Sequence, residues 1–235
     1  AHQNVSGNQA FILGRSDAYI GVLIDDLITK GTDEPYRMFT SRAEHRILLR
    51  QDNADVRLTH LGYKLGLASE TRLKNVEAKI EDVLQIEKAL GKLSLEVSES
   101  NAYLKSKNST EVSQKLRAYS LITRPEVDLP SMINFIPSVS NSIYAISQDP
   151  EVIEQVEIKA KYSGYIQKEQ DSAEKILKFE NIRLRPDFDY GSLTSLSMES
   201  RIKLEQIKPS SLGQAARISG VSPSDISVLL VHLGK

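Results

Sequence analysis

The sequence predicts a mostly α-helical protein, on three observations. Apolar residues recur every three or four positions in several segments, the spacing that places them on one face of a helix. Many of these segments begin at a Ser or Asp that can cap a helix, and Pro or Gly residues separate them. Alternating apolar and polar residues, which predict strands, are scarce. We therefore expect a helical arm and a small C-terminal helical bundle.

Three helices are predicted in the first half of the chain. The first covers residues 16–29, with Ser16 as its cap. The second is expected to begin at Ser41, because Ser41 and Glu44 have the spacing of a capping box. The third covers residues 70–93 and is long and amphipathic, with charges of both signs on its outer face.

The middle of the chain gives weaker signals. Residues 111–119 are predicted to form a short helix. Residues 121–137 contain three prolines, which predict loops with brief turns. A clear helix start follows at Asp149, where a capping residue precedes a proline at the first helical position. This helix is expected to run as far as Phe179.

Three compact helices are predicted at the end of the chain. The first covers residues 197–206 and the second residues 211–219, where Ser211 and Gln214 have capping-box spacing. The third begins at Ser222. The last two helices imitate a helix-turn-helix, but residues 224–231 contain one acid and no basic residue, so we expect a packed bundle or a protein-docking surface rather than a DNA reader.

Composition excludes several classes of protein. The chain of 235 residues has a formal net charge of −1, so any nucleic-acid contact must come from a local patch. It has no cysteine, which excludes disulfides and thiolate chemistry and is compatible with a reducing cytosol. Its apolar runs are too short to span a bilayer, and its first residues do not resemble a signal peptide.

The segment 31–59 is unusual because it contains five arginines, five acidic residues and no lysine. A guanidinium group can grip a carboxylate or a phosphate with two parallel bonds, which suggests that Arg is specifically needed here. In a helix beginning at Ser41, Arg42, Arg46 and Arg50 would form one stripe facing an anionic partner. The alternative is that the neighbouring acids satisfy the arginines in an internal ion-pair network.

A second patch lies around Gly164. Lys161, Tyr165 and Lys168 share a face of the predicted long helix, which suits lysines that contact phosphates and a ring that stacks on bases. The alternative is that Gly164 permits close helix packing and that Tyr162 and Tyr165 belong to the core.

No motif for catalysis, cofactor binding or metal binding is recognisable. No two of the 12 glycines are separated by a single residue, so no dinucleotide-binding fingerprint is present. The four histidines lie far apart, without the spacing of metal ligands. By itself this chain is expected to lack catalytic, cofactor-binding and metal-binding residues.

A family resemblance adds to this interpretation. The run GTDEPYRMFTSRAEHRILLRQDNADVRLT resembles the characteristic motif of the MnmG (GidA) family of tRNA uridine 5-carboxymethylaminomethyl modification enzymes. The preceding SDAYIGVLIDDLITK and the later YSGYIQKEQ and SLTSLSMESRIKLEQIKPSSLGQAARISGVSPSDISVLL also resemble that family, in the same order. The resemblance covers nearly the whole chain. One departure is His45, where the family often has Tyr.

The resemblance implies a parent enzyme that depends on FAD and uses NADH and methylenetetrahydrofolate to modify C5 of the wobble uridine of tRNA. The chain would be its C-terminal part, without the FAD-binding domain, inactive alone and without a bound cofactor. The implied divisions are a tail of the FAD-binding domain at 1–30, an Arg-rich connection at 31–66, a helical arm at 67–145 and a C-terminal helical subdomain at 146–235.

The resemblance also implies partners and binding residues. The partners are tRNA and the GTPase MnmE, with a cytoplasmic parent that forms a homodimer and a heterotetramer with the GTPase. The residues expected to bind tRNA are Arg37, Arg42, Arg46, Arg50, Lys161 and Tyr165. Exposed apolar positions at Leu193, Leu196, Leu212 and Ile226 favour a protein partner for the C-terminal bundle. The residues expected to bind it are Leu196, Glu199, Arg201, Leu204, Leu212, Gln214 and Arg217. The alternative is a purely structural helical interaction module.

Overall fold

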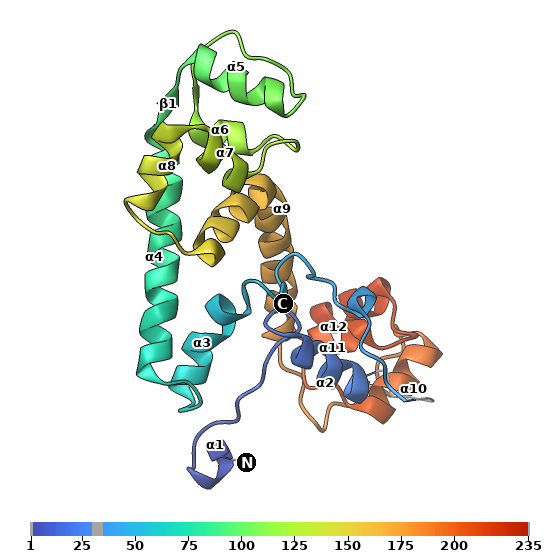
Figure 1. Cartoon of the computed structure of the whole chain (residues 1–235). Helices are drawn as coiled ribbons and strands as arrows, with labels where there is room; N and C mark the ends of the chain where they lie inside the picture. Colours follow the sequence, from blue (N-terminus) through green and yellow to red (C-terminus); the bar gives the residue numbers. More distant parts are fainter. Residues whose placement is uncertain (1, 30–34, 235) are drawn as a thin grey trace. The chain divides into compact units, whose positions relative to one another are not determined.

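A computed structural model describes residues 2–29 and 35–234 of the chain (Figure 1). The protein is mostly helical, as predicted. It divides into two compact units: unit 1 consists of Ala1–Leu49 with Gln167–Lys235, and unit 2 of Arg50–Ile166. The domain boundaries that the sequence predicts near residues 30, 66 and 145 remain predictions.

Unit 2 is built from short helices around one long helix. Its elements are α3 (Ala54–Lys64), α4 (Glu70–Lys92), β1 (Ser94–Leu95), α5 (Val97–Ser106), β2 (Leu116–Arg117), α6 (Ala118–Ile122), α7 (Leu129–Phe135), α8 (Pro137–Tyr144) and the first half of α9 (Pro150–Glu180). The two strands pair in antiparallel fashion, with Ser94 opposite Arg117 and Leu95 opposite Leu116.

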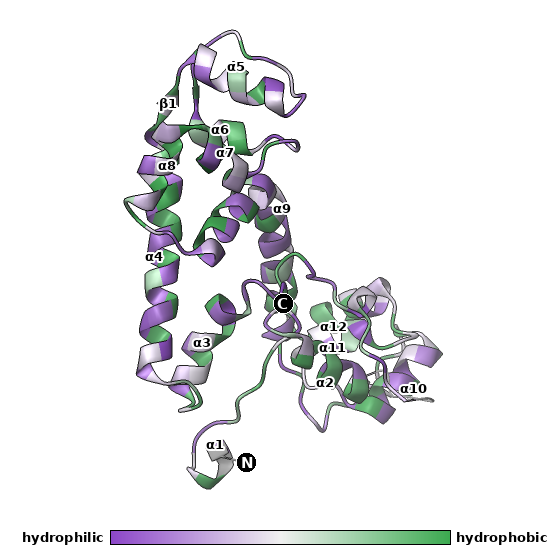
Figure 2. Ribbon diagram, in the orientation of Figure 1, coloured by the Kyte–Doolittle hydropathy of each residue, from purple (hydrophilic) through white to green (hydrophobic). Residues whose placement is uncertain are grey.

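Helix α4 forms as the sequence predicts. The side chain of Ser69 accepts a hydrogen bond from the backbone N–H of Arg72, which caps the helix. Its buried residues are Val76, Val83, Ile86 and Leu90, spaced so that they share one face. Figure 2 shows hydrophobic and hydrophilic residues together along α4, as expected for a helix with one buried side.

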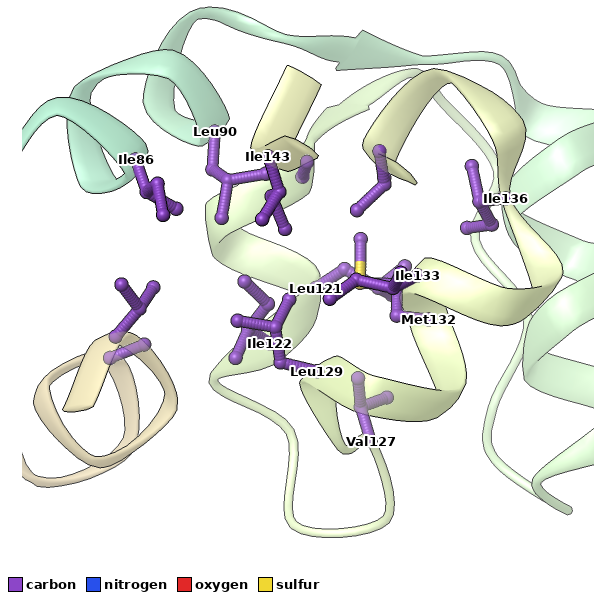
Figure 3. Packing of buried hydrophobic residues seen from close by; sticks show 14 of the residues in the cluster. Ile86, Leu90, Leu121, Ile122, Val127, Leu129, Met132, Ile133, Ile136 and Ile143 are labelled. Carbon is purple, nitrogen blue, oxygen red and sulfur yellow. The ribbon is translucent and has the colours of Figure 1, made fainter. Parts of the chain in front are cut away.

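The core of unit 2 lies where α4 packs against α6 and α8 (Figure 3). Side chains from α6, α7 and α8 meet those of α4, and many are completely buried. The labelled members in Figure 3 are Ile86, Leu90, Leu121, Ile122, Val127, Leu129, Met132, Ile133, Ile136 and Ile143. A buried apolar cluster of this size gives unit 2 its own hydrophobic core.

Two predictions for the middle of the chain are wrong. Residues 111–119 do not form one helix, because Asn101 holds the backbone of Val112 in a loop with two hydrogen bonds (2.7 and 3.0 Å). Residues 121–137 are not mainly loops. Pro130 lies in the first turn of α7 and Pro137 begins α8, where the missing N–H of proline costs nothing.

Unit 1 combines an N-terminal helix with a C-terminal bundle. Its elements are α1 (His2–Val5), α2 (Tyr19–Thr29), the 3-10 helix η1 (Thr40–Arg42), the second half of α9, α10 (Met198–Ile207), α11 (Leu212–Arg217) and α12 (Pro223–His232). The core of the bundle consists of Leu184, Tyr190, Leu196, Leu204, Leu212, Ala215, Ile218 and Leu229.

The three C-terminal helices begin within one residue of the predicted positions, but only part of the predicted capping is formed. Ser197, Ser211 and Ser222 accept hydrogen bonds from the first turns of α10, α11 and α12. At α12 the capping box is complete, since Asp225 accepts a hydrogen bond from the N–H of Ser222. At α11 it is not, because the side chain of Gln214 accepts from Ser210 instead.

The predicted helix from Ser41 is absent. After η1 the chain continues through a series of turns to residue 49. Glu44 does not reach back to the N-terminus of a helix, because its carboxylate forms a bidentate pair with Arg15 (2.8 and 3.1 Å). Arg42 and Arg46 therefore do not lie on one helical face. Helix α2 begins at Tyr19, three residues later than predicted, so Ser16 is not its cap.

Candidate functional site

An ionic network, buried except at Glu44, lies in the N-terminal part of unit 1. The guanidinium of Arg15 donates hydrogen bonds to Asp25 (3.0 Å), to Asp26 (2.7 Å) and to Glu44. Burial would lower the pKa of Arg15, but hydrogen bonds to Glu44 and Asp26 hold this pKa above its ordinary value. Arg15 thus ties α2 to the segment that follows η1.

Arg217 extends the same network to the C-terminal bundle of unit 1. It donates two hydrogen bonds to Asp25 (2.7 and 2.8 Å) and a further one to Glu180, at the end of α9. Burial would lower the pKa of Arg217, but Asp25 and Glu180 raise it overall. Glu180 also accepts from Ser211 (2.6 Å), so the network reaches the cap of α11.

Sequence reasoning missed Arg15, Asp25, Asp26 and Glu180. A signal was present at Asp25 and Asp26, because two adjacent acids interrupt an otherwise apolar helix and need a buried cation. His45 is another buried polar residue whose partner lies far away in the sequence. It is buried, and its Nδ1 lies 2.6 Å from a carboxylate oxygen of Glu169, 124 residues away in sequence.

The predicted tRNA-binding arginines of unit 1 differ in their exposure and in the contacts that they already make. Arg46 is exposed and makes no hydrogen bond or ion pair with the residues that the structure describes. Arg37 is exposed and its guanidinium lies 4.9 Å from the ring centre of Phe39. Arg42 is half-buried, 4.5 Å from the ring centre of Tyr36 and 3.8 Å from Asp26.

The predicted tRNA-binding residues of unit 2 are not all free. Arg50 donates to the carboxylate of Asp52 (3.1 Å), and Lys161 forms an ion pair with Glu157 (2.7 Å). Burial would raise the pKa of Asp52, but hydrogen bonds from Gln155 and Arg50 lower it overall.

The tyrosines of the second patch are not core residues. Tyr162 and Tyr165 are 50% and 61% exposed, with ring centres 6.5 Å apart. An added Cβ at Gly164 would meet no atom within 4 Å, so this glycine is not required for close helix packing. The two rings are tilted by 54° to each other, so each offers its own face on which a planar group can stack.

The expectation of exposed apolar residues in the C-terminal bundle is wrong in part. Leu196, Leu204 and Leu212 are buried in the core of unit 1, because Leu184 and Tyr190 of the preceding segment pack into the same cluster as the three short helices. Leu193 and Ile226 are partly buried and pack against the same core. Arg217 is engaged in the ionic network, and Gln214 binds Ser210.

Helix α10 nevertheless presents an exposed apolar surface. Met198 and Ile202, one helical turn apart, are 72% and 56% exposed. They border an open hollow of about 610 Å³, lined also by Asp189, Gly191, Arg201, Glu205 and Gln206. The Nε of Arg201 is buried and has no hydrogen-bond partner among the described residues. We call these seven residues the α10 surface.

Among residues 2–29 and 35–234, no group of three or more His, Asp or Glu side chains could hold a metal ion. No helix in these ranges is both long enough and apolar enough to cross a membrane.

Comparison with protein families gives two matches. Residues 70–170 match the tRNA modifying enzyme MnmG/GidA C-terminal helical domain. Residues 172–235 match the MnmG/GidA C-terminal helical bundle.

Curated relatives extend the match to the whole chain. The tRNA uridine 5-carboxymethylaminomethyl modification enzyme MnmG of Christiangramia forsetii is 49% identical over 231 residues, which is 98% of this chain and 37% of that protein. The enzyme of the same name from Cytophaga hutchinsonii is 45% identical over 235 residues, 100% of this chain and 38% of that protein. The chain thus spans well under half the length of these relatives.

A solved structure has the same fold. GidA of Aquifex aeolicus, in its form II crystal, matches 99% of this chain and 35% of its own, with a TM-score of 0.78 and 36% identity. Its form I crystal gives a TM-score of 0.75. The sequence motifs, the helical units and these matches agree, and the chain belongs to the MnmG/GidA family of tRNA-modifying enzymes, matching its C-terminal helical part.

Proposed function

We propose that this chain is the C-terminal helical part of an FAD-dependent enzyme that modifies C5 of the wobble uridine of tRNA. In this role it contributes tRNA binding and a docking surface for the GTPase MnmE. The observation that carries the proposal is the match of both helical regions to the C-terminal domains of one tRNA-modifying family. The parent would be a cytoplasmic homodimer that forms a heterotetramer with the GTPase.

The cofactors would be held by other parts of the parent enzyme. The spacing of the 12 glycines provides no cradle for the pyrophosphate of FAD or NADH. We therefore expect the purified chain to show no flavin absorption band and no activity of its own. A stoichiometric flavin retained through purification would contradict this assignment.

The tRNA contact is assigned first to Arg46 and Arg37. Both are exposed. Arg46 has no competing carboxylate among the described residues, so its guanidinium can donate hydrogen bonds to a phosphate without breaking an ion pair. Arg42 would contribute only in part, because Asp26 lies near it. Arg50 and Lys161 would have to exchange their carboxylate partners for phosphates.

A filter-binding experiment with the Arg46→Ala variant tests this assignment. Loss of one phosphate contact should weaken binding to all tRNA species alike and lower the slope of log affinity against log salt by about 1. Arg185→Ala is the matched control, since Arg185 is also exposed and lies outside the segment 31–59. If both variants bind like the wild type, Arg46 is not a tRNA contact.

Tyr165 is assigned a stacking role in addition to the electrostatic contact made by the arginines. A ring that is 61% exposed on a helix is available to an unpaired base. Tyr165→Ala should weaken tRNA binding roughly tenfold, whereas Tyr165→Phe should not, because stacking needs the ring and not the hydroxyl. Equal effects of the two substitutions would exclude stacking.

The GTPase contact is assigned to the α10 surface rather than to the buried leucines of the bundle. Met198 and Ile202 supply an apolar centre, and Arg201, Glu205 and Asp189 supply a charged rim, the arrangement typical of a protein interface. Glu199, exposed on the same helix, would lie at the edge of the contact.

A calorimetric titration of MnmE with the Ile202→Lys variant tests this surface. A lysine at the apolar centre should weaken binding at least tenfold, because the partner would have to desolvate it. Lys203→Ala is the control, since Lys203 is exposed on the same helix but does not line the hollow. Unchanged affinity of Ile202→Lys would place the docking surface elsewhere.

The second candidate function is a helical interaction module without a role in tRNA recognition. The two exposed apolar residues of α10 favour it. The Arg46→Ala and Ile202→Lys experiments separate the two functions, because a pure interaction module would lose partner binding with the second variant and would bind no tRNA specifically in either case.

A further inference from the structure

Unit 2 carries a basic corner where α3 turns into α4 (Figure 1). Residues 60–74 contain three Lys or Arg side chains and one acid, so with His60 neutral this stretch has a charge of +2 in a chain whose net charge is −1. Its basic residues are Lys64, Arg72 and Lys74, and its acid is Glu70. All four are exposed. We call residues 60–74 the α3–α4 corner.

Two local motifs fix the shape of this corner. The turn after α3 contains Gly66 with a φ of +73°, and the N–H of Gly66 donates to the carbonyl of Tyr63 (2.9 Å). The N–H of Leu67 donates to the carbonyl of Gly62 (2.8 Å), which completes a Schellman motif. Ser69 then caps α4, and α3 packs against α4. The side chains of the corner are therefore presented on a defined turn rather than on a loose loop.

Lys64 and Arg72 differ from the other cations around them. Most basic side chains of unit 2 form ion pairs or donate hydrogen bonds, as Lys74 does to Glu70 (2.7 Å). The side chains of Lys64 and Arg72 make no hydrogen bond or ion pair with the residues that the structure describes. Each can therefore bind an anion without breaking an ion pair within the described part of the chain.

The same stretch exposes two large side chains. Leu67 is 79% exposed and Tyr63 is 42% exposed. In a Schellman turn the residue at position 67 commonly packs against the side chain at position 62, but Gly62 has no side chain to cover it. An exposed aromatic ring among cations is a combination that suits RNA, since the ring can meet a base while the cations neutralise phosphates.

We propose that the α3–α4 corner is an RNA-binding surface that holds the phosphate backbone of the tRNA substrate. The proposal rests on the tRNA-modifying function proposed above, and it adds contacts beyond those of segment 31–59 and α9. Charge selects the occupant. One leucine and one tyrosine are too few for the apolar centre of a protein interface, whereas Lys64 and Arg72 can neutralise two phosphates. Because phosphates carry no sequence information, the corner contributes affinity and not the choice of nucleotide.

Filter binding of a tRNA transcript to the 235-residue chain, at a series of salt concentrations, tests the proposal. The corner variant combines Lys64→Gln with Arg72→Gln and so removes two charges at exposed positions. The control variant combines Lys88→Gln with Lys92→Gln. Both control lysines are exposed on α4 and make no ion pair in the described part of the chain. They begin about 24 Å along the helix from Arg72, at a rise of about 1.5 Å per residue.

We expect the corner variant to bind tRNA about tenfold more weakly and to lower the slope of log affinity against log salt by about 1.5–2, because two phosphate contacts are lost. The control variant should bind like the wild type. A variant that combines Lys64→Arg with Arg72→Lys should also bind like the wild type, since it keeps both charges. The corner variant should lose the same factor for a transcript whose wobble uridine is replaced by cytidine.

Three results would overturn the proposal. Wild-type affinity and slope in the corner variant would leave the corner to a protein partner. An equal loss in the control variant would mean that overall charge explains the binding. A loss confined to the transcript with the wobble uridine would show that the corner reads a base.

Arg46→Ala, measured in the same series, separates this proposal from the proposed function. If Arg46→Ala weakens binding and the corner variant does not, the corner alone is wrong. If the wild-type chain binds no tRNA, the proposed contribution of this chain to tRNA binding fails, and the corner fails with it.

Discussion

At the scale of single residues, Asp225 shows how one carboxylate can hold two helices. It is buried and accepts hydrogen bonds from the N–H of Ser197, the hydroxyl of Ser200, and both the N–H and the hydroxyl of Ser222. It thus completes the cap of α12 and fixes the first turn of α10. Burial would raise the pKa of Asp225, but the hydrogen bonds from Ser222, Ser197 and Ser200 hold it well below its ordinary range.

Replacing Asp225 should therefore have a pH-dependent effect. Asp225→Asn presents an amide N–H₂ to donors that need an acceptor, and should lower the free energy of unfolding at pH 7 by about 2–3 kcal/mol. Since the pKa of the carboxyl is depressed by folding, its contribution is fully present above the unfolded-state pKa of about 3.9 and is lost as pH falls toward the folded-state pKa. The difference between variant and wild type, measured by urea denaturation, should shrink below about pH 4. Asp187→Asn, at an exposed position, is the control, and an equal loss in both variants would contradict the prediction.

Two glycines allow a matched comparison at the same scale. A Cβ at Gly21 would lie 2.2 Å from the carbonyl oxygen of Gly14, whereas a Cβ at Gly164 would meet nothing within 4 Å. Gly21→Ala should destabilise unit 1 by at least ~2 kcal/mol, because backbone would have to move. Gly164→Ala should stabilise α9 by about 1 kcal/mol through helix propensity. Thermal unfolding measures both, and a stable Gly21→Ala protein would show that the close approach of α2 to residue 14 is wrong.

At the scale of elements, Arg217 joins three helices of unit 1. It lies at the end of α11 and binds Asp25 of α2 and Glu180 of α9. Arg217→Met should lower the free energy of unfolding by roughly 3–5 kcal/mol, since it leaves two carboxylates in a largely buried site with one fewer cation. Arg217→Lys should recover little of this loss, because an ammonium group cannot reproduce the two bonds to Asp25.

The control for Arg217 is Arg185→Met, at an exposed position that makes no ion pair in the described part of the chain. That variant should stay within about 0.5 kcal/mol of the wild type. Guanidinium denaturation followed by circular dichroism gives both values. A small loss of unfolding free energy in Arg217→Met would mean that Asp25 and Glu180 find other hydrogen-bond donors. Arg217 would then again be a candidate for contact with the GTPase.

Elements were predictable where local chemistry alone decides the structure. The helices that follow Ser69, Ser197, Ser211 and Ser222 begin within one residue of their predicted starts, because a serine cap needs only the neighbouring backbone N–H groups. The segment after Ser41 has the same local pattern but forms no helix, since a residue 29 positions away, Arg15, captures Glu44. Local rules could not reveal that competition.

At the scale of the whole molecule, the fold class followed from the sequence but most of the candidate site did not. The mostly helical architecture depends on periodicities that the sequence displays directly. The ionic network depends on pairs such as Arg217 with Asp25, 192 residues apart, which only the folded chain brings together. The leucines of the bundle were expected at a surface, because the sequence alone does not show that Leu184 and Tyr190 of the preceding segment join the same core.

The two units each have their own core, which leads to a prediction for the whole molecule. Leu121 is fully buried in the cluster of unit 2, and Leu204 is fully buried in that of unit 1. Truncating either to Ala should cost about 2–5 kcal/mol, because a leucine cavity in a packed core collapses only partly. Since separate cores support separate opening reactions, hydrogen exchange should rise mainly in residues 50–166 for Leu121→Ala and mainly in residues 167–235 for Leu204→Ala. If either substitution raised exchange equally throughout both units, the chain would unfold as one cooperative body, and the two cores would not be independent sources of stability.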